Sequence, residues 1–173
     1  LFGGQAARGG TASVDAVLAV PPDTRCEADA DLLMEWSRGL RGRLFSSLTS
    51  NTLRREICRN LRGQRVPAGT VLFRSGEKVD DIYVIVSGTV LVATDGAEVW
   101  HPRPATEHQE GTCVGDEEVG SSGQRSSTAT TAVDCFLAAL DHAAYTRMSS
   151  SVAAEGAVLG ELRRAGSAQE AKR

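Results

Sequence analysis

The residues best suited to do chemistry lie in one stretch, Gly111–Thr128 (GTCVGDEEVGSSGQRSST). Three consecutive acids, Asp116, Glu117 and Glu118, come before a turn of glycine and serine, and a single arginine, Arg125, comes after it. The guanidinium of an arginine stays protonated and can donate two hydrogen bonds to one phosphate group, so such a loop can bind phosphate. Glycine, serine and aspartate are also common in surface turns. This stretch alone therefore leaves a phosphate site and an ordinary surface loop both open.

The histidines and cysteines do not form a pattern that a catalyst or a metal site would need. None of the three histidines lies in a recognisable nucleophile or metal motif: His101, His108 and His142. No Cys-x-x-Cys pair occurs among the four cysteines: Cys26, Cys58, Cys113 and Cys135. The run of acids is typical of a solvated surface, because successive side chains point in different directions and do not converge on one cation. We expect no enzyme activity, no metal and no cofactor, and isolated thiols in a reducing compartment.

Composition and charge indicate one globular domain. The chain has 173 residues, of which 41% are hydrophobic, and a formal net charge of −3. Basic residues are scattered except within 38–65, which argues against a nucleic-acid surface. The longest apolar run, Ala16–Val20, is too short to span a membrane, and no signal-peptide pattern opens the chain. We expect a cytoplasmic module, and a start at Leu1 without Met suggests a fragment of a larger protein.

The first third of the sequence divides into an arm and a helical segment. Residues 1–26 are rich in glycine and alanine and include Pro21-Pro22, so we expect an extended arm or one ordered only by a partner. Residues 27–66 contain two helical patterns, the second with Ser50 as its N-cap. The apolar residues that recur at helical spacing are Leu32, Leu33 and Trp36, then Leu53, Ile57 and Leu61.

Residues 67–141 change to the pattern of short strands. The segments Asp81–Ser87 and Thr89–Ala93 are rich in β-branched and aromatic residues, and Val71–Phe73 is a short apolar run. Two further strand candidates are Thr128–Val133 and Phe136–Leu140. Asp95-Gly96 has the composition of a tight hairpin turn before Glu98–His101. Residues 142–173 return to an alanine-rich helical pattern. Helices that flank a block of strands predict an α+β domain with a sandwich or jelly roll at its centre.

The strand region carries an ordered set of motifs. Pro67–Glu77 (PAGTVLFRSGE) and Asp81–Gly88 (DIYVIVSG) resemble the opening strands of the cyclic nucleotide-binding domain family. Further along, Gly111–Asp116 (GTCVGD) is similar to the family's G-x-x-F-G-E, and Arg125–Ala129 (RSSTA) is similar to its R-x-A-T-V. Asp134–Asp141 (DCFLAALD) is similar to the family's closing strand. No single motif decides the family, but their order is specific.

The resemblance implies a fold and a site. The fold is an eight-stranded antiparallel β-roll over residues 67–141, between N-terminal and C-terminal helices, with a phosphate-binding cassette at 111–128. Gly115 would let the backbone approach the ligand, N–H groups of a short helix would face the cyclic phosphate, and Arg125 would close the site. The implied ligand is cAMP or cGMP. The implied site residues are Val114, Gly115, Asp116, Glu117, Glu118, Val119, Arg125, Ser126 and Ser127.

Three positions depart from the family's pattern. Asp116 stands where the family has a glutamate that binds the ribose 2′-hydroxyl, and Val114 replaces a phenylalanine. Glu118 replaces a small alanine beside the phosphate. A carboxylate directed inward at about 4 Å from the phosphate would oppose binding by roughly 4 kcal/mol, whereas one directed to solvent would be nearly harmless. Alternatively, Asp116 and Arg125 pair with each other and hold an empty loop closed.

The base and the lid are also implied by the resemblance. A hydroxyl after the arginine accompanies cGMP in the family, and Ser126 occupies that position, although a serine at the start of a strand needs no such role. The lid is normally an apolar side chain on the C-terminal helix. The candidates in this chain are Val158, Leu159 and Leu162.

Two functions follow from these patterns. In the first, the chain is a regulatory sensor in which a cyclic nucleotide draws the C-terminal helix over the roll. In the second, the fold is kept as a scaffold that binds no nucleotide, or binds it weakly. The arm 1–26 and the C-terminal helix then contact other domains or proteins of a larger assembly, such as a cytoskeletal or ciliary one. We expect neither nucleic acid nor a membrane span for this chain.

Overall fold

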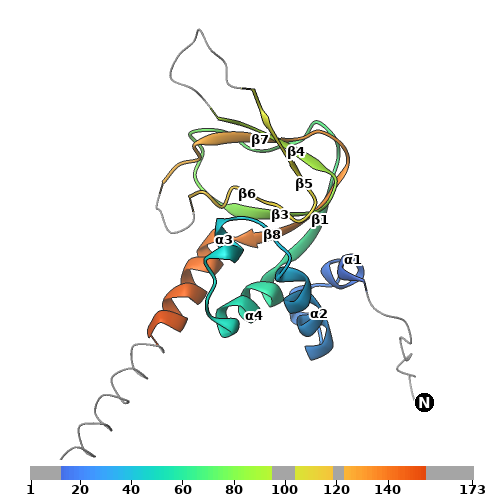
Figure 1. Ribbon diagram of the computed structural model, residues 1–173, viewed down its shortest axis with the longest axis vertical. Coiled ribbons are helices and arrows are strands. Elements are labelled where there is room, and N and C mark those ends of the chain that lie inside the picture. Colours follow the sequence, from blue (N-terminus) through green and yellow to red (C-terminus); the bar gives the residue numbers. More distant parts are fainter. Residues whose placement is uncertain (1–12, 95–103, 119–122, 155–173) are drawn as a thin grey trace, which may run out of the picture.

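The computed structural model describes residues 13–94, 104–118 and 123–154, and two four-stranded antiparallel sheets form its centre (Figure 1). The first sheet has the order β1-β8-β3-β6, and the second has the order β2-β7-β4-β5. The strands of the first sheet are β1 (Arg62–Val66), β8 (Cys135–Asp141), β3 (Asp81–Ser87) and β6 (Cys113–Val114). Those of the second are β2 (Val71–Phe73), β7 (Ser127–Thr131), β4 (Thr89–Thr94) and β5 (Thr106–Gln109). The predicted α+β class and eight-stranded antiparallel β-roll are confirmed.

Strands β3 and β8 form the centre of the first sheet and are buried on both faces. Along β3, Ile82 and Val84 point to the helices, whereas Tyr83 and Ile85 point into the space between the sheets. Strand β8 alternates in the same way. Because neither face meets water, both strands read as continuous apolar runs instead of alternating ones. Both strands were expected from the sequence, over Asp81–Ser87 and Phe136–Leu140.

Helices cover the outer face of the first sheet (Figure 1). They are α1 (Val14–Leu18), α2 (Glu27–Ser37), α3 (Arg43–Ser46) and α4 (Asn51–Asn60), with a 3₁₀ turn at Pro22–Thr24. The Ser50 side chain accepts a hydrogen bond from the Leu53 N–H, so it caps α4 as predicted. Ile57 of α4 and Leu33 of α2 are fully buried in the core between helices and sheet.

Part of the segment expected to be an arm is helical. Within residues 1–26, α1 places Val17 and Leu18 in the helix-side core, and residues 1–12 lie outside the described part. Arg25 holds this segment to α4, because its guanidinium donates to the carbonyls of Val20 and Arg59. Burial lowers the pKa of Arg25, although Asp29 opposes this effect. The apolar residues of α1 thus obtain a packing partner that the local composition did not reveal.

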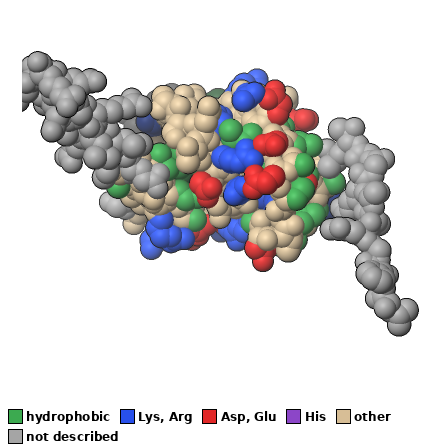
Figure 2. All heavy atoms as spheres, turned by 90° about the horizontal axis from the view of Figure 1, so that it is seen from below, with side chains coloured by type: hydrophobic (Ala, Val, Ile, Leu, Met, Phe, Trp, Pro, Cys, Tyr) green, Lys and Arg blue, Asp and Glu red, His purple; other side chains and the backbone are tan. Residues whose placement is uncertain are grey.

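The helical end of the molecule carries mixed charges. Arg55 of α4 forms ion pairs with Glu27 and Asp31 of α2, each at 2.7 Å. Figure 2 views the molecule from this end and shows basic and acidic side chains next to one another. Such exposed pairs contribute little to stability, about 0–1 kcal/mol each, but they give this face no single sign of charge.

Residues 142–154 form a helix that leaves the roll directly after β8, beside α3 and α4 (orange in Figure 1). Asp141 caps it by accepting the Ala144 N–H at 2.6 Å. Tyr145, Met148 and Val152 pack on the helix-side core. The hairpin turn expected at Asp95-Gly96 and the strand expected at Glu98–His101 lie outside the described residues.

Removal of the Ile57 side chain tests the helix-side core. We expect Ile57→Ala to lower the free energy of unfolding by about 2–5 kcal/mol, because it leaves a cavity between α4 and the sheet. Leu91→Ala is the control, since Leu91 is 37% exposed, and it should change the free energy by only about 0.5 kcal/mol. Urea unfolding measures both. Equal effects of the two substitutions would contradict this description of the core.

Candidate functional site

The backbone of Arg125 is fixed between the two ends of a turn that follows β2. Its N–H donates to the carbonyl of Glu77 at 2.8 Å, and its carbonyl accepts the N–H of Gly76 at the same distance. Gly76 has φ +83°, a backbone conformation that glycine adopts without the strain of a side chain. Arg125 therefore enters β7 from a defined position, and its side chain is directed toward Phe73 and Gly115.

The Arg125 guanidinium is buried and held on three sides. The residue is 3% exposed, and its guanidinium carbon lies 4.0 Å from the centre of the Phe73 ring. Nη1 donates to the Gly115 carbonyl at 2.8 Å, and Nη2 donates to the Asp81 carbonyl. Among the described residues, Nε has no hydrogen-bond partner. We call Phe73, Gly115, Arg125 and Ser126 the cradle.

Gly115 leaves the space that the guanidinium occupies. Its φ is +77°, and a Cβ atom at this position would lie 2.5 Å from Nη1 of Arg125 and 2.9 Å from the Phe73 ring. A side chain here would meet a close contact in addition to backbone strain. The glycine is therefore needed so that Arg125 itself can approach. The family resemblance had implied another reason for it, the approach of the backbone to a ligand.

The Glu118 carboxylate points into the cradle. The residue is 8% exposed, and its Oε2 lies 3.6 Å from Nη1 of Arg125. Its Oε1 accepts hydrogen bonds from the Ser126 N–H at 3.0 Å and from the Ser126 hydroxyl at 2.6 Å. Burial alone would raise the pKa of Glu118, but the two bonds from Ser126 and the charge of Arg125 together hold that pKa below its usual value. Glu118 is therefore ionised near neutral pH.

Asp116 points away from the cradle, toward the helices. Its carboxylate accepts the N–H of Leu44 at 2.9 Å, at the first turn of α3, and the residue is 4% exposed. A Cβ at Gly42 would lie 2.6 Å from this carboxylate, so a glycine is required there too. The alternative in which Asp116 pairs with Arg125 is wrong. Glu118 takes that place, because the N-terminal N–H groups of α3 offer the shorter aspartate a partner.

The segment before Glu118 is tied to the loop that precedes α3. The Arg41 N–H donates to the Gly111 carbonyl at 2.7 Å, and the Cys113 N–H donates to the Arg41 carbonyl at 2.8 Å. Arg43 adds a side-chain bond to the Glu117 carbonyl at 3.1 Å. Together with the bond from Leu44 to Asp116, these contacts attach the cassette to the helical layer.

The other predicted site residues are dispersed. Val114 is buried between the sheets, Glu117 is exposed, and Ser127 is buried in β7. Residues 117–118 form a turn. Val119 and the lid candidates Val158, Leu159 and Leu162 lie outside the described residues.

Sequence reasoning missed the contacts that Phe73, Asp81 and Leu44 make at the site. Phe73 had been noted only as part of an apolar strand, and the contributions of Asp81 and Leu44 are a backbone carbonyl and a backbone N–H. No residue type marks such backbone groups in a sequence. An aromatic residue at the end of a strand, before a turn that leads back to a lone arginine, is the one signal that was available.

Comparison with known proteins decides the family. The sequence profile of the family described as "Cyclic nucleotide-binding domain" matches residues 63–152. The chain belongs to this family. A cyclic nucleotide-gated potassium channel of Rhizobium etli is 36% identical over 121 residues, which cover 70% of this chain and 32% of the channel. The chain thus spans about a third of the length of this curated relative.

Solved structures share the fold of this cyclic nucleotide-binding domain. The regulatory domain of Toxoplasma gondii PKA, co-crystallised with cAMP, aligns with a TM-score of 0.59 at 19% identity, over 72% of this chain and 46% of that one. A cyclic nucleotide-binding-like protein from Brucella abortus aligns with a TM-score of 0.51 at 23% identity, over 63% of this chain and 91% of that one.

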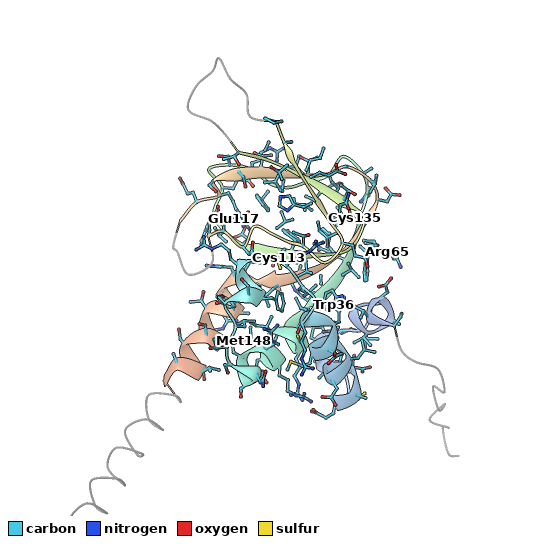
Figure 3. The ribbon with its side chains drawn as sticks, viewed as in Figure 1. Trp36, Arg65, Cys113, Glu117, Cys135 and Met148 are labelled. Atoms are coloured by element: carbon cyan, nitrogen blue, oxygen red, sulfur yellow. The ribbon has the colours of Figure 1, made fainter. Side chains whose placement is uncertain are left out.

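A surface cavity of about 270 Å³ lies elsewhere on the domain, lined by Arg65, Val66, Pro67, Ser87, Asp134, Cys135 and Phe136. Figure 3 shows Glu117 of the cassette and Arg65 on opposite sides of the roll. In this cavity Asp134 is already bonded to the Ala68 N–H at 2.9 Å. Within the described ranges no three metal-binding side chains cluster, and no helix has the length and apolarity to cross a bilayer.

A pair of matched glycine substitutions tests the packing of the cradle. Gly69 has φ +76°, almost the value of Gly115, but a Cβ there would meet nothing within 4 Å. We expect Gly69→Ala to cost about 1–2 kcal/mol of stability from backbone strain alone. Gly115→Ala should cost about 1–3 kcal/mol more, because its Cβ displaces Arg125 and Phe73. Thermal or urea unfolding measures the stability of both variants. Equal stabilities would contradict this packing.

The pH dependence of stability tests the Glu118 interaction. Because the pKa of Glu118 is lowered in the folded chain, its contribution is fully present above the unfolded value of about 4.3 and is lost as the pH falls through the folded value. We expect Glu118→Gln to be about 1.5–3 kcal/mol less stable than the wild type at pH 7. Urea unfolding should show this difference shrinking below about pH 4. A difference that is constant with pH would mean that the carboxylate charge is not involved.

Proposed function

We propose that this cyclic nucleotide-binding domain is a regulatory module that binds cAMP or cGMP, with the cyclic phosphate at Arg125. The observation that carries the proposal is a buried guanidinium whose Nε has no hydrogen-bond partner among the described residues. Burial of a charge and of an unmet donor costs stability, and such groups gather where a ligand completes their contacts. One monoanionic phosphate matches one arginine in charge. The module itself carries out no reaction in this proposal.

The cradle offers further contacts to such a ligand. The Ser126 N–H lies beside Arg125, where it can donate to a second phosphate oxygen once Glu118 has moved. Its hydroxyl, then free, can bond the guanine amino group of cGMP, as the family resemblance implies. Asp116 remains with Leu44 in this structure, so a ribose contact would require it to leave α3.

We also propose how binding is transmitted. Glu117 and Asp116 contact Arg43 and Leu44, so a change in the cassette reaches α3 directly. The C-terminal helix packs on the same helical layer, and the lid candidates Val158, Leu159 and Leu162 follow it in the sequence, outside the described residues. The output would act on other domains of a larger cytoplasmic protein, through this helix and through residues 1–26. The match covers 32% of the channel of Rhizobium etli, so a segment similar to this chain occurs there within a longer protein.

One observation favours a second function. The Glu118 carboxylate already supplies a negative charge to Arg125 and accepts both donors of Ser126. Because Arg125 and Ser126 have a partner in Glu118, the chain can keep this fold without nucleotide, as a scaffold would. In that function the surfaces of the helical layer would contact partner proteins of an assembly, such as a cytoskeletal or ciliary one.

Calorimetric titration of the 173-residue chain with cAMP and cGMP tests the sensor. We expect micromolar or tighter binding, reduced at least about 100-fold in Arg125→Ala, which corresponds to about 2.7 kcal/mol. Arg125→Lys keeps the charge but loses the fork of donors and should be intermediate. Arg38→Ala is the control, because this exposed arginine pairs with Glu35 of α2 and is outside the cradle.

Circular dichroism and thermal unfolding establish that each variant is folded. Folded wild type and folded Glu118→Ala that both fail to bind either nucleotide would contradict the sensor and support the scaffold. Equal binding by the wild type and the folded Arg125→Ala would place the phosphate elsewhere.

A further inference from the structure

We propose that Glu118 sets the affinity of the cradle, as an internal carboxylate that occupies the anion subsite and must be displaced by a ligand. The inference rests on the proposed function, because the displaced group and the incoming phosphate use the same donors. It concerns what sets the affinity of that site. The residues that carry it are Glu118, Arg125 and Ser126.

The geometry of Glu118 is that of a bound anion. One carboxylate oxygen accepts the Ser126 N–H at 3.0 Å and its hydroxyl at 2.6 Å, and the other lies 3.6 Å from the guanidinium of Arg125. Charge-assisted bonds from a backbone N–H and an arginine are the bonds that a phosphate would make in this place. A carboxylate and a phosphate cannot use the same donors at once, and both are negative.

The two neighbouring acids, Asp116 and Glu117, do not face Arg125. Glu117 is exposed, and Asp116 is committed to Leu44 of α3. Only Glu118 of the three consecutive acids reaches Arg125 within ion-pair distance. The three consecutive acids thus have three different environments, and Glu118 is the one whose carboxylate lies in the cradle.

The side chain can leave without disturbing a sheet. Glu118 lies in a turn, and its backbone belongs to neither strand β6 nor strand β7. The guanidinium of Arg125 stays fixed by the Gly115 and Asp81 carbonyls when the carboxylate moves. Rotation of one side chain therefore opens the subsite while its donors remain in place.

Competition of this kind sets a threshold for binding. A tethered carboxylate acts at a high effective concentration, and the apparent dissociation constant equals the intrinsic one divided by the fraction of chains in which the subsite is open. If Glu118 is displaced in about one chain in ten to one in a hundred, affinity falls about 10- to 100-fold. The wild type therefore needs a higher nucleotide concentration than Glu118→Ala to reach the same occupancy.

The test compares Glu118→Ala with Glu110→Ala, which removes an exposed carboxylate of equal charge outside the cradle. Calorimetry with cAMP and cGMP should show at least about tenfold tighter binding for Glu118→Ala than for the wild type. Glu110→Ala should stay within about twofold, since screening by solvent weakens its effect. The double variant Glu118→Ala/Arg125→Ala should lose the gain, which would place it in the cradle.

Amide hydrogen exchange at Ser126 supplies a readout that needs no ligand. The Ser126 N–H should be protected in the wild type, exposed to exchange in ligand-free Glu118→Ala, and protected again when nucleotide is added. Unchanged protection in ligand-free Glu118→Ala would overturn the inference, because the carboxylate would then not hold the subsite.

The outcomes separate this inference from the proposed function. Equally tight binding by the wild type and Glu118→Ala would overturn the inference and leave the sensor standing. A silent wild type with binding by Glu118→Ala would support the inference, because Glu118 would then block an otherwise competent subsite, and it would contradict the sensor function of the wild-type chain. Absence of binding in every folded variant would overturn both, and the exchange data would then show whether Glu118 is only a structural counter-ion of Arg125.

Discussion

The burial of one guanidinium organises the site of this domain. Arg125 is positioned by the turn after β2, stacked on Phe73, and bonded to two backbone carbonyls. A buried cation needs a negative partner, because desolvation without one is costly. Gly115 provides the space for the guanidinium, and Glu118 provides the charge. The form of the cassette is a consequence of this requirement.

The same requirement links the site to the helices. The segment that carries Glu118 also carries Asp116, whose carboxylate is bonded to the start of α3. The Glu118 side chain, whose displacement we propose, lies two residues from this contact. The helical layer is in turn packed against β3 and β8, the most buried strands of the roll. The exchange of anions that we propose for the cradle would therefore take place next to the helical layer through which we propose the signal leaves.

The sequence predicted those parts of the fold that depend on local patterns. The apolar runs of β3 and β8 and the Ser50 cap of α4 each follow from residue type and neighbours. Strand β1, by contrast, was predicted within a helical segment. Its residues, RGQRV, are mostly polar, and it is strand because β8 offers it a partner for hydrogen bonds. Helix α1 was missed for the same reason, since its packing partners are distant in sequence.

The sequence pointed to Arg125 and Glu118 as candidate site residues, but it did not reveal most of the groups that contact them. Arg125 and Glu118 were identified from the spacing of the motifs and from the family resemblance. The family profile matches residues 63–152, which include both. Which acid faces the arginine could not be predicted, because it depends on the N–H groups of α3, whose position is set by tertiary packing. The backbone carbonyls that hold Arg125 have no signature in side-chain chemistry at all.

The most direct test of the central claim is the NMR signal of the Arg125 Nε–H during titration with cAMP or cGMP. This donor is buried and, among the described residues, without a hydrogen-bond partner. We predict that nucleotide moves the Nε–H resonance downfield and slows its exchange with water, as a new bond to a phosphate oxygen forms. A resonance that stays unchanged while the nucleotide demonstrably binds would mean that the phosphate lies elsewhere, and that the cradle is not the binding site.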